Sequence, residues 1–302
     1  MHIQRTGLEK ALLAAATAVL FTVAAPCQMA PSTPALPSAD TSIVPTLQVS
    51  ALRMDPSPQG SGASGIAPEP EPQPNKPRFI TRMLKRGLED QKGLYAAPFK
   101  PSNLKWDALV LAGTGALIAT DRRIEKQVPT SHFQAYQNTS NVVVGGLAAT
   151  LAGVWIYGLK TDDPRAKEMG NLEIEALSNA FLVYAPMQFI AGRQRPGEGN
   201  GNGNFWRHHA MNTSFPAGHA MFTWTMATVV AHEYPKPWVK VLAYGAISAV
   251  SVSRMLARDH WASDMLVGSV LGFSIGRHIF YSRCDPELTE ACQRHSRNRD
   301  QP

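Results

Sequence analysis

Three short stretches of this 302-residue sequence carry side chains that could bind an anion or move a proton. In the first, GRQRPGEGNGNGN, Arg193 and Arg195 lie two residues apart and Pro196 ends the preceding apolar run. A guanidinium matches two oxygens of a phosphoryl group with parallel hydrogen bonds. Arginines near the end of a helix are also ordinary partners of the helix dipole. Taken alone, this stretch leaves both interpretations open.

The second stretch, SFPAGHA at residues 214–220, stands directly before an uncharged apolar run. Proline suits the first turn of a helix, and Gly218 lets the backbone approach a ligand closely. The free N–H groups of a helix start bind anions, and His219 at that point can give a proton to a leaving oxygen. A histidine that merely opens a helix fits the same residues.

The third stretch, SRMLARDHWASD, contains Ser253, Arg254, His260 and Asp264. We expect Asp259 to cap a helix that follows, so that His260 and Asp264 are four residues apart on one face. A carboxylate there would fix the imidazole tautomer and stabilise positive charge on a ring that attacks an electrophile. A surface His–Asp pair of little energetic value is the alternative.

Long apolar runs rich in Ala, Leu, Val and Gly surround these stretches and end at polar loops. Their length and spacing predict an all-α fold, since only VVV at 142–144 has the β-branched character of a strand. We expect a six-helix bundle with helices at about 106–120, 140–159, 173–191, 219–233, 238–254 and 260–280. Each polar stretch then lies at a helix end.

The N-terminus has the pattern of a secretory signal peptide at residues 1–27, with a basic segment, the apolar run ALLAAATAVLFTVAA and small residues. Residues 28–77 are rich in proline, serine and glycine and lack an apolar period, which indicates a disordered linker. The helical domain is expected at 78–282 and a polar C-terminal tail at 283–302. In that tail, Cys284 and Cys292 either pair in an oxidising compartment or remain two surface thiols.

The formal net charge of +6 and the pI near 9.3 favour an anionic partner. The basic residues do not form one long run. The charge alone therefore fits phosphate, lipid headgroups or nucleic acid as the partner.

Helix length bears on whether the domain crosses a membrane. The segment at 140–159 has no charged residue, but most other apolar runs span only 13 to 18 residues between charges, and a bilayer needs about 20. Six spanning helices after a signal peptide would also place the turn after the third helix in the cytoplasm. We expect an exported, periplasmic or envelope-associated domain that can touch a membrane surface; an integral membrane protein is the alternative.

The spacing of the three stretches is more specific than any one of them. An Arg-Pro pair at 195–196 is followed, after 19 residues, by Pro-x-Gly-His at 216–219; after 33 more residues comes Ser-Arg-x5-His-x3-Asp at 253–264. This pattern resembles the three-part signature of the type-2 phosphatidic acid phosphatase and vanadium haloperoxidase superfamily. The motifs cover residues 188–264, and the helix pattern covers roughly 100–282.

The resemblance implies a helical-bundle phosphatase that works through a phosphohistidine and needs no metal or other cofactor. Its expected substrate is a phosphomonoester or a lipid phosphate or pyrophosphate, so the expected partner is a phosphorylated small molecule or a lipid phosphate, and not nucleic acid. The implied catalytic residues are His260 as the nucleophile, Asp264 as its orienting partner, and His219 as general acid and base. The implied phosphate-binding groups are the side chains of Arg195, Arg254 and Ser253 and the backbone N–H of Gly218. Phosphoryl transfer needs this set, because it depends on positioning and on stabilising the equatorial charge.

Two positions depart from the family pattern. The family has a lysine seven residues before the first arginine, where this sequence has Gln188. A neutral amide can hydrogen-bond phosphate but lacks the charge, and Arg193 or Arg207 is the candidate to supply it. In the second motif, Ala217 replaces the usual serine and removes one hydroxyl.

Two other functions fit the same motifs. A vanadate-dependent haloperoxidase would use the same pocket, although Gln188 lacks a charge that would help to hold vanadate. A weakly active or non-catalytic anion-binding envelope protein would keep the fold, as the two departures allow. A metal site built on His208 and His209 is disfavoured, because adjacent histidines point in different directions and no His-x3-His or cysteine pair completes a ligand set.

Overall fold

A computed structural model of the protein describes residues 79–129 and 131–299, and every regular element in that part of the chain is helical. The expected signal peptide and linker, residues 1–27 and 28–77, lie outside the described residues. The described elements are α2 Phe79–Ala96, the 3₁₀-helix η1 Ala97–Phe99, α3 Leu104–Glu125, α4 Phe133–Thr161, α5 Pro164–Ala191, α6 Gly218–Glu233, α7 Pro237–Leu256, α8 Ala262–Arg283 and α9 Glu290–Arg299. The all-α prediction is confirmed for these residues.

The six predicted helices are all present as α3 to α8, but with different bounds. α4 begins at Phe133 rather than 140, and α5 begins at Pro164 rather than 173. The earlier start of α5 has a local cause, since Asp163 caps the helix by accepting a hydrogen bond from the Ala166 N–H at 2.9 Å. α2 and α9 correct the count of six; both are too polar to stand out as apolar runs.

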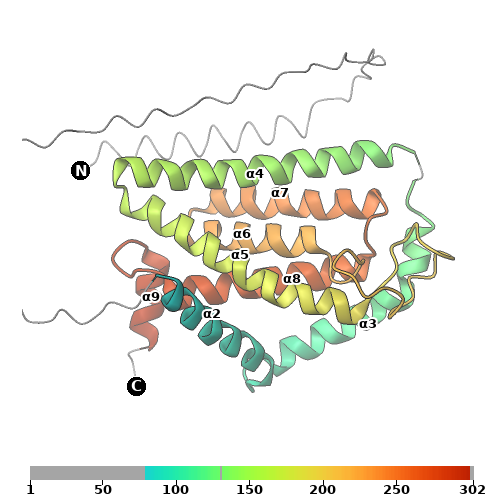
Figure 1. The fold of residues 1–302 in the computed structure, drawn as a ribbon, viewed down its shortest axis with the longest axis horizontal. Helices are drawn as coiled ribbons and strands as arrows, with labels where there is room; N and C mark the ends of the chain where they lie inside the picture. The colour runs from blue at the N-terminus through green and yellow to red at the C-terminus, as the bar shows by residue number, and fades with distance from the viewer. Residues whose placement is uncertain (1–78, 130, 300–302) are drawn as a thin grey trace, which may run out of the picture. The chain divides into compact units, whose positions relative to one another are not determined.

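α6 is the central helix of this part of the chain. Most of its residues are buried, and it packs against α5, α7 and α8. Figure 1 shows α6 between α7 and α8. A helix that is apolar on all sides suits such a position, and it holds its first turn, with His219, in a fixed place.

α6 and α8 approach closely because glycine occupies every fourth position on one face of α8, at residues 268, 272 and 276. A Cβ atom at Gly272 would lie only 2.2 Å from the Met221 carbonyl oxygen of α6. Since that oxygen belongs to a helix backbone, the two helices would have to separate to admit any side chain. The glycine face therefore fixes the start of α8 against the start of α6.

Replacing Gly272 by alanine is expected to lower the free energy of unfolding by about 1–3 kcal/mol, the usual cost of overpacking a core. Gly245 of α7 provides the control, because a Cβ there would meet no atom within 4 Å. Gly245→Ala should raise stability by up to about 1 kcal/mol, since alanine is the better helix former. Urea unfolding of both variants measures the difference; equal stabilities would show that the helices do not depend on this contact.

The two cysteines of the polar tail form a disulfide, Cys284–Cys292, which decides between the two alternatives left by the sequence. The segment that they enclose is tied back to the bundle. Glu233 Oε1 accepts hydrogen bonds from Arg165 Nε and from Thr289 Oγ1, both at 3.0 Å. The predicted tail thus contains an ordered helix, α9, at the end of α6 that lies away from His219 (Figure 1).

Two described helices, α4 and α7, are long and apolar enough to cross a membrane. Only 22% of the hydrophobic window of each is buried, whereas the core helix of a soluble domain is mostly buried. Large apolar side chains on these helices face outward, as shown by exposed fractions of 54% for Val142 and 72% for Val241. Such a surface is typical of contact with lipid or another protein.

Candidate active site

The three polar stretches meet at one end of the bundle. Arg195 follows α5 and His219 lies in the first turn of α6. Arg254 lies in the last turn of α7, and His260 precedes α8. These helix ends lie on the same side in Figure 1, next to the long connection from α5 to α6. The ring centroids of His219 and His260 are 6.2 Å apart, so the two imidazoles are neighbours at this end of the bundle.

A glycine turn separates the two arginines of the first stretch. Gly192 ends α5 in the left-handed conformation, with a φ of 49°. A Cβ there would lie 2.1 Å from the His208 carbonyl oxygen, so both the conformation and the space require glycine. Beyond this turn the Arg193 side chain is buried, whereas the Arg195 side chain remains 23% exposed.

The guanidinium groups of Arg195 and Arg254 are held by one shared residue, Asp259, and by two asparagine amides. Asp259 Oδ2 lies 2.7 Å from Arg254 Nη1, and the Asp259 carbonyl accepts a hydrogen bond from Arg195 Nη1 at 3.3 Å. Asn212 Oδ1 accepts from Arg195 Nη2 at 2.7 Å, and Asn141 Oδ1 accepts from Arg254 Nη2. Arg254 Nε is buried and has no partner among the described residues. This N–H is available to a ligand.

The ring of His260 is held in one orientation by a backbone carbonyl. Its Nδ1 atom lies 2.8 Å from the Ser214 oxygen, and a carbonyl accepts only from N–H, so the proton is on Nδ1 and the lone pair is on Nε2. Nε2 is buried and has no partner within the described part of the chain. Burial first, and then the charge of Arg195, lower the pKa of His260 to about 3. The ring is therefore neutral near pH 7, with a lone pair on Nε2 that can act as a nucleophile.

His219 faces the same positive charges. Its pKa is lowered to about 4, first by burial and then by the charge of Arg254, while Asp259 acts in the opposite direction. A doubly negative ligand between the rings would raise this pKa by offsetting the two guanidiniums. A ring that is neutral in the free protein and protonated beside an anion can serve as a general acid.

The carboxylate of Asp264 has different partners from those predicted. It accepts hydrogen bonds from Arg193 Nη1 and Ser214 Oγ, both at 2.5 Å, and from the Trp261 N–H at 3.0 Å. The prediction placed His260 inside a helix capped by Asp259, but α8 begins at Ala262 and its N-cap is Trp261. His260 thus precedes the helix, and the carboxylate reaches it only indirectly, through Ser214.

Gln188 was predicted to contact phosphate, and the structure corrects this. Its side chain is fully buried; Nε2 donates to the Pro216 carbonyl at 2.7 Å, and Oε1 accepts from the Thr213 N–H at 2.6 Å and from the Thr213 hydroxyl at 2.8 Å. Both ends of the amide are used. Gln188 braces the segment whose Ser214 carbonyl holds His260.

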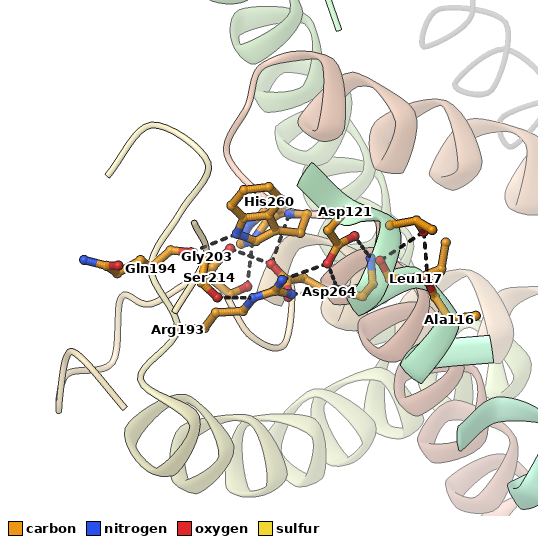
Figure 2. Close-up of polar contacts among 12 residues, drawn as sticks. Ala116, Leu117, Asp121, Arg193, Gln194, Gly203, Ser214, His260 and Asp264 are labelled. Atoms are coloured by element: carbon orange, nitrogen blue, oxygen red, sulfur yellow. Dashed lines mark hydrogen bonds and ion pairs between the residues drawn. The ribbon is translucent and has the colours of Figure 1, made fainter. Parts of the chain in front are cut away.

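Arg193 was also predicted to bind phosphate, but the protein itself uses its donors. Nη2 pairs with Asp121 Oδ2 at 2.7 Å, Nη1 pairs with Asp264, and Nε donates to the Gly203 carbonyl at 3.2 Å. Figure 2 shows Arg193 between the two carboxylates. The guanidinium also lies over the rings of Phe205 and Trp261. Arg193 is a buried structural cation rather than a free anion ligand.

The two remaining predicted phosphate-binding groups are the hydroxyl of Ser253 and the backbone N–H of Gly218. The Ser253 hydroxyl donates to the Tyr136 carbonyl at 2.7 Å, so its single proton is already used. Gly218 is the first residue of α6, and its N–H lies at the open helix start as expected. A Cβ at Gly218 would come within 2.8 Å of the Tyr184 ring, so glycine permits this packing.

Metal-ligating residues do not gather in the described residues: none of their His, Cys, Asp and Glu side chains form a group of three or more that could hold an ion. His208 Nε2 lies 3.7 Å from Glu198 Oε2, and His209 Nδ1 lies 3.4 Å from the Phe189 carbonyl. Both histidines are exposed. Arg207, the other candidate to replace the family lysine, is exposed and lines a cavity of about 440 Å³ beside α3.

Several residues of the site were absent from the sequence prediction. Ser214 lies inside the second stretch, but its role depends on a backbone carbonyl, which any residue possesses. Asn141, Asn212 and Asp121 lie in no motif. The one available signal was the polar sequence Asp121-Arg122-Arg123 at the end of an apolar run, and it gave no indication of what the carboxylate contacts.

Comparison with known proteins gives a match over the part of the chain that contains these residues. Residues 173–286 match the sequence model of the PAP2 superfamily. A lipid A 1-phosphatase from Porphyromonas gingivalis is 37% identical over 117 residues, which are 37% of this chain and 24% of that protein. The chain thus spans about a quarter of the length of the curated relative that it matches. No solved structure matches.

Proposed function

Because residues 173–286 of this chain form a domain of the PAP2 superfamily, we propose that the protein is a metal-independent phosphatase that acts through a phosphohistidine. One observation carries this proposal. The ring of His260 is fixed with its lone pair on a buried, unpartnered Nε2, and the charges of Arg195 and Arg254 act on the same ring. This combination suits attack on a phosphoryl group, whose negative charge the arginines would bind.

In the first step, His260 Nε2 forms a bond to phosphorus and the bond from phosphorus to the leaving oxygen breaks. The electron pair of that bond stays on the leaving oxygen, which takes a proton from His219. Arg195, Arg254 and the Gly218 N–H would bind the non-bridging oxygens, since all three lie at the same end of the bundle. Arg254 contributes its unpartnered Nε–H.

In the second step, water replaces His260 on phosphorus. His219, now neutral, accepts a proton from the attacking water, and the His260 ring leaves as the neutral imidazole with its proton on Nδ1. The Ser214 carbonyl retains that proton throughout, so the same tautomer is restored. Asp264 is connected to the ring only through Ser214, whose hydroxyl donates a hydrogen bond to Asp264 Oδ2.

We further propose a lipid phosphate or lipid pyrophosphate as the substrate, and the six-helix arrangement of the PAP2 superfamily for α3 to α8. The similarity to a lipid A 1-phosphatase supports a lipid substrate. The outward apolar surface of α4 and α7 supports it independently, since these helices would place the site beside a membrane. The Cys284–Cys292 disulfide supports an exported, envelope-associated protein, because disulfides form in oxidising compartments.

A substrate panel tests the function. Purified full-length protein should hydrolyse at least one lipid phosphate, in the presence of EDTA, with inhibition by vanadate. Activity that requires an added divalent cation would contradict the metal-independent mechanism. Peroxide-dependent bromide oxidation with vanadate, and no ester hydrolysis, would instead identify a haloperoxidase.

The same panel tests the location when it is run on cell fractions. Activity should remain with membranes after an alkaline carbonate wash, because α4 and α7 expose apolar side chains that carbonate does not release from lipid. Release of all activity into the wash would show a peripheral protein, and activity only on water-soluble esters would contradict the lipid substrate.

A further inference from the structure

Asp121 is the one buried residue of α3, with an exposed fraction of 2%. Large apolar side chains of the same helix are exposed, among them Leu109 at 61% and Leu111 at 72%. An isolated carboxylate is costly to bury unless it is paired and hydrogen-bonded. The burial of Asp121 is therefore explained by its partners rather than by packing of the helix.

Those partners connect α3 to the start of α8. Asp121 Oδ2 accepts from Arg193 Nη2 at 2.7 Å and from the Ser263 hydroxyl, while Oδ1 accepts from the Ser263 N–H at 3.1 Å. Arg193 Nη1 also donates to Ser263 Oγ at 2.7 Å. Four hydrogen bonds thus join three residues that are far apart in the sequence, and all three are buried.

From this cluster a continuous path leads to His260. Arg193 donates to Asp264 Oδ1, the Ser214 hydroxyl donates to Asp264 Oδ2, and the Ser214 carbonyl accepts from His260 Nδ1. Figure 2 shows the labelled residues of the path, from Asp121 through Arg193 and Asp264 to Ser214 and His260. Asp121 does not contact the ring of His260, so any effect that it has on the chemistry is indirect.

With both of its carboxylates ionised, the path carries one excess negative charge. Two carboxylates, Asp121 and Asp264, pair with the single guanidinium of Arg193. We propose that Asp121 is a positioning residue that leaves one excess negative charge behind Ser214 and so stabilises positive charge on His260 during phosphoryl transfer. This inference rests on the proposed function.

The charge matters because the ring becomes cationic when Nε2 bonds to phosphorus. The Nδ1–H then binds the Ser214 carbonyl more strongly, and a buried negative charge beyond that carbonyl lowers the energy of the cation. Without Asp121, the guanidinium of Arg193 would be balanced by Asp264 alone, and the excess would disappear. The energy of the ground state, in which the ring is neutral, would change much less.

Asp121→Asn is the test, because the amide keeps the shape and removes the charge. Orthovanadate adopts the five-coordinate geometry of the transition state and bonds to the attacking nitrogen, whereas inorganic phosphate binds in the ground state. Isothermal titration should show vanadate affinity weakened about tenfold, the effect expected of one nearby charge at an effective dielectric of about 20. The affinity for phosphate should stay within about twofold of the wild-type value. In steady-state assays, kcat should fall by about the same factor as the vanadate affinity, and KM should be unchanged.

Asp90 provides a matched control. It is a buried carboxylate of α2, 3% exposed, that pairs with Arg283 Nη2 at 2.8 Å at the far end of α8. Asp90→Asn should lower the melting temperature as Asp121→Asn does, yet leave the ratio of vanadate to phosphate affinity unchanged. If Asp121→Asn also leaves that ratio unchanged, its role is structural and the inference is wrong.

A second variant covers the case in which Asp121→Asn does not fold. The double variant Asp121→Asn/Arg193→Gln removes a buried ion pair as a unit, which is tolerated better than removing one partner. It keeps the single negative charge of Asp264, so its affinity ratio should stay close to that of the wild type. A tenfold lower ratio in the double variant would overturn the inference.

The titration also separates this inference from the proposed function. Wild-type protein that binds neither phosphate nor vanadate contradicts the phosphatase proposal itself. Wild-type protein that binds both anions, with no change of ratio in the single variant, contradicts only the role of Asp121.

Discussion

His260→Ala is expected to lower kcat on every phosphate ester by about 10⁴-fold or more, since loss of a covalent nucleophile removes the reaction path rather than one interaction. The binding of inorganic phosphate should be weakened much less, because Arg195 and Arg254 are held by Asp259, Asn141 and Asn212 and not by His260. Steady-state assays and phosphate titration measure the two effects separately.

Two observations would complete this test. Wild-type protein denatured in alkaline detergent, where the acid-labile N–P bond of phosphohistidine survives, should carry phosphate on His260, and the alanine variant should carry none. His208→Ala is the control, since His208 is an exposed histidine of the neighbouring connection, paired only loosely with Glu198 at 3.7 Å. Retention of substantial activity by His260→Ala, with His208→Ala unaffected, would exclude the phosphohistidine mechanism.

His219→Gln should separate substrates by the quality of their leaving group. Alkyl phosphates need a proton on the leaving oxygen, so their kcat should fall by about 10²–10⁴-fold, the usual contribution of a general acid. An aryl phosphate such as p-nitrophenyl phosphate leaves without that proton, so its first step should change little. Rapid-quench measurement of phosphoenzyme formation on both substrates provides the comparison, and an equal loss on both would argue against an acid role.

The pH dependence of the same variant gives a second test. The acid form of His219 donates the proton, and its pKa in the free protein is lowered to about 4. The active fraction therefore falls about tenfold for each pH unit above that value. Because kcat/KM reports the free enzyme, the ratio of wild type to His219→Gln should decrease as pH rises from 4. A constant ratio would show that protonation of His219 is not used.

The fold was largely predictable because its six main helices are apolar runs bounded by polar loops. The prediction failed where a helix depends on other contacts. α9 is strongly polar. The Cys284–Cys292 disulfide joins its first turn to the residue after α8, and Thr289, which precedes α9, donates a hydrogen bond to Glu233. The predicted start of α5 lies too late in the sequence. Asp163 and Pro164 form a standard helix start, but the first turns of the helix are not continuously apolar.

The proximity of the proposed reacting groups could be predicted from the sequence, but the contacts that hold them in place could not. His219, His260, Arg195 and Arg254 lie together because motif spacing reflects the ends of packed helices. The group that accepts the hydrogen bond from His260 Nδ1 depends on whether α8 begins before or after His260. Sequence patterns do not locate a helix start to within two residues. Asp121 lies more than 70 residues from Arg193 and forms part of no motif, so only the packing of α3 could reveal it.

The amide of Gln188 has a consequence for the end of the catalytic cycle. A lysine at this position would add a third cation to the two that face the product, whereas Gln188 is buried and contacts Thr213 and Pro216. Inorganic phosphate held by fewer charge-assisted contacts dissociates faster. Release of product limits turnover in many enzymes that bind charged ligands tightly. In the proposed reaction, the product phosphate therefore has one charged contact fewer and should dissociate faster. The buried amide instead supports the segment that orients His260.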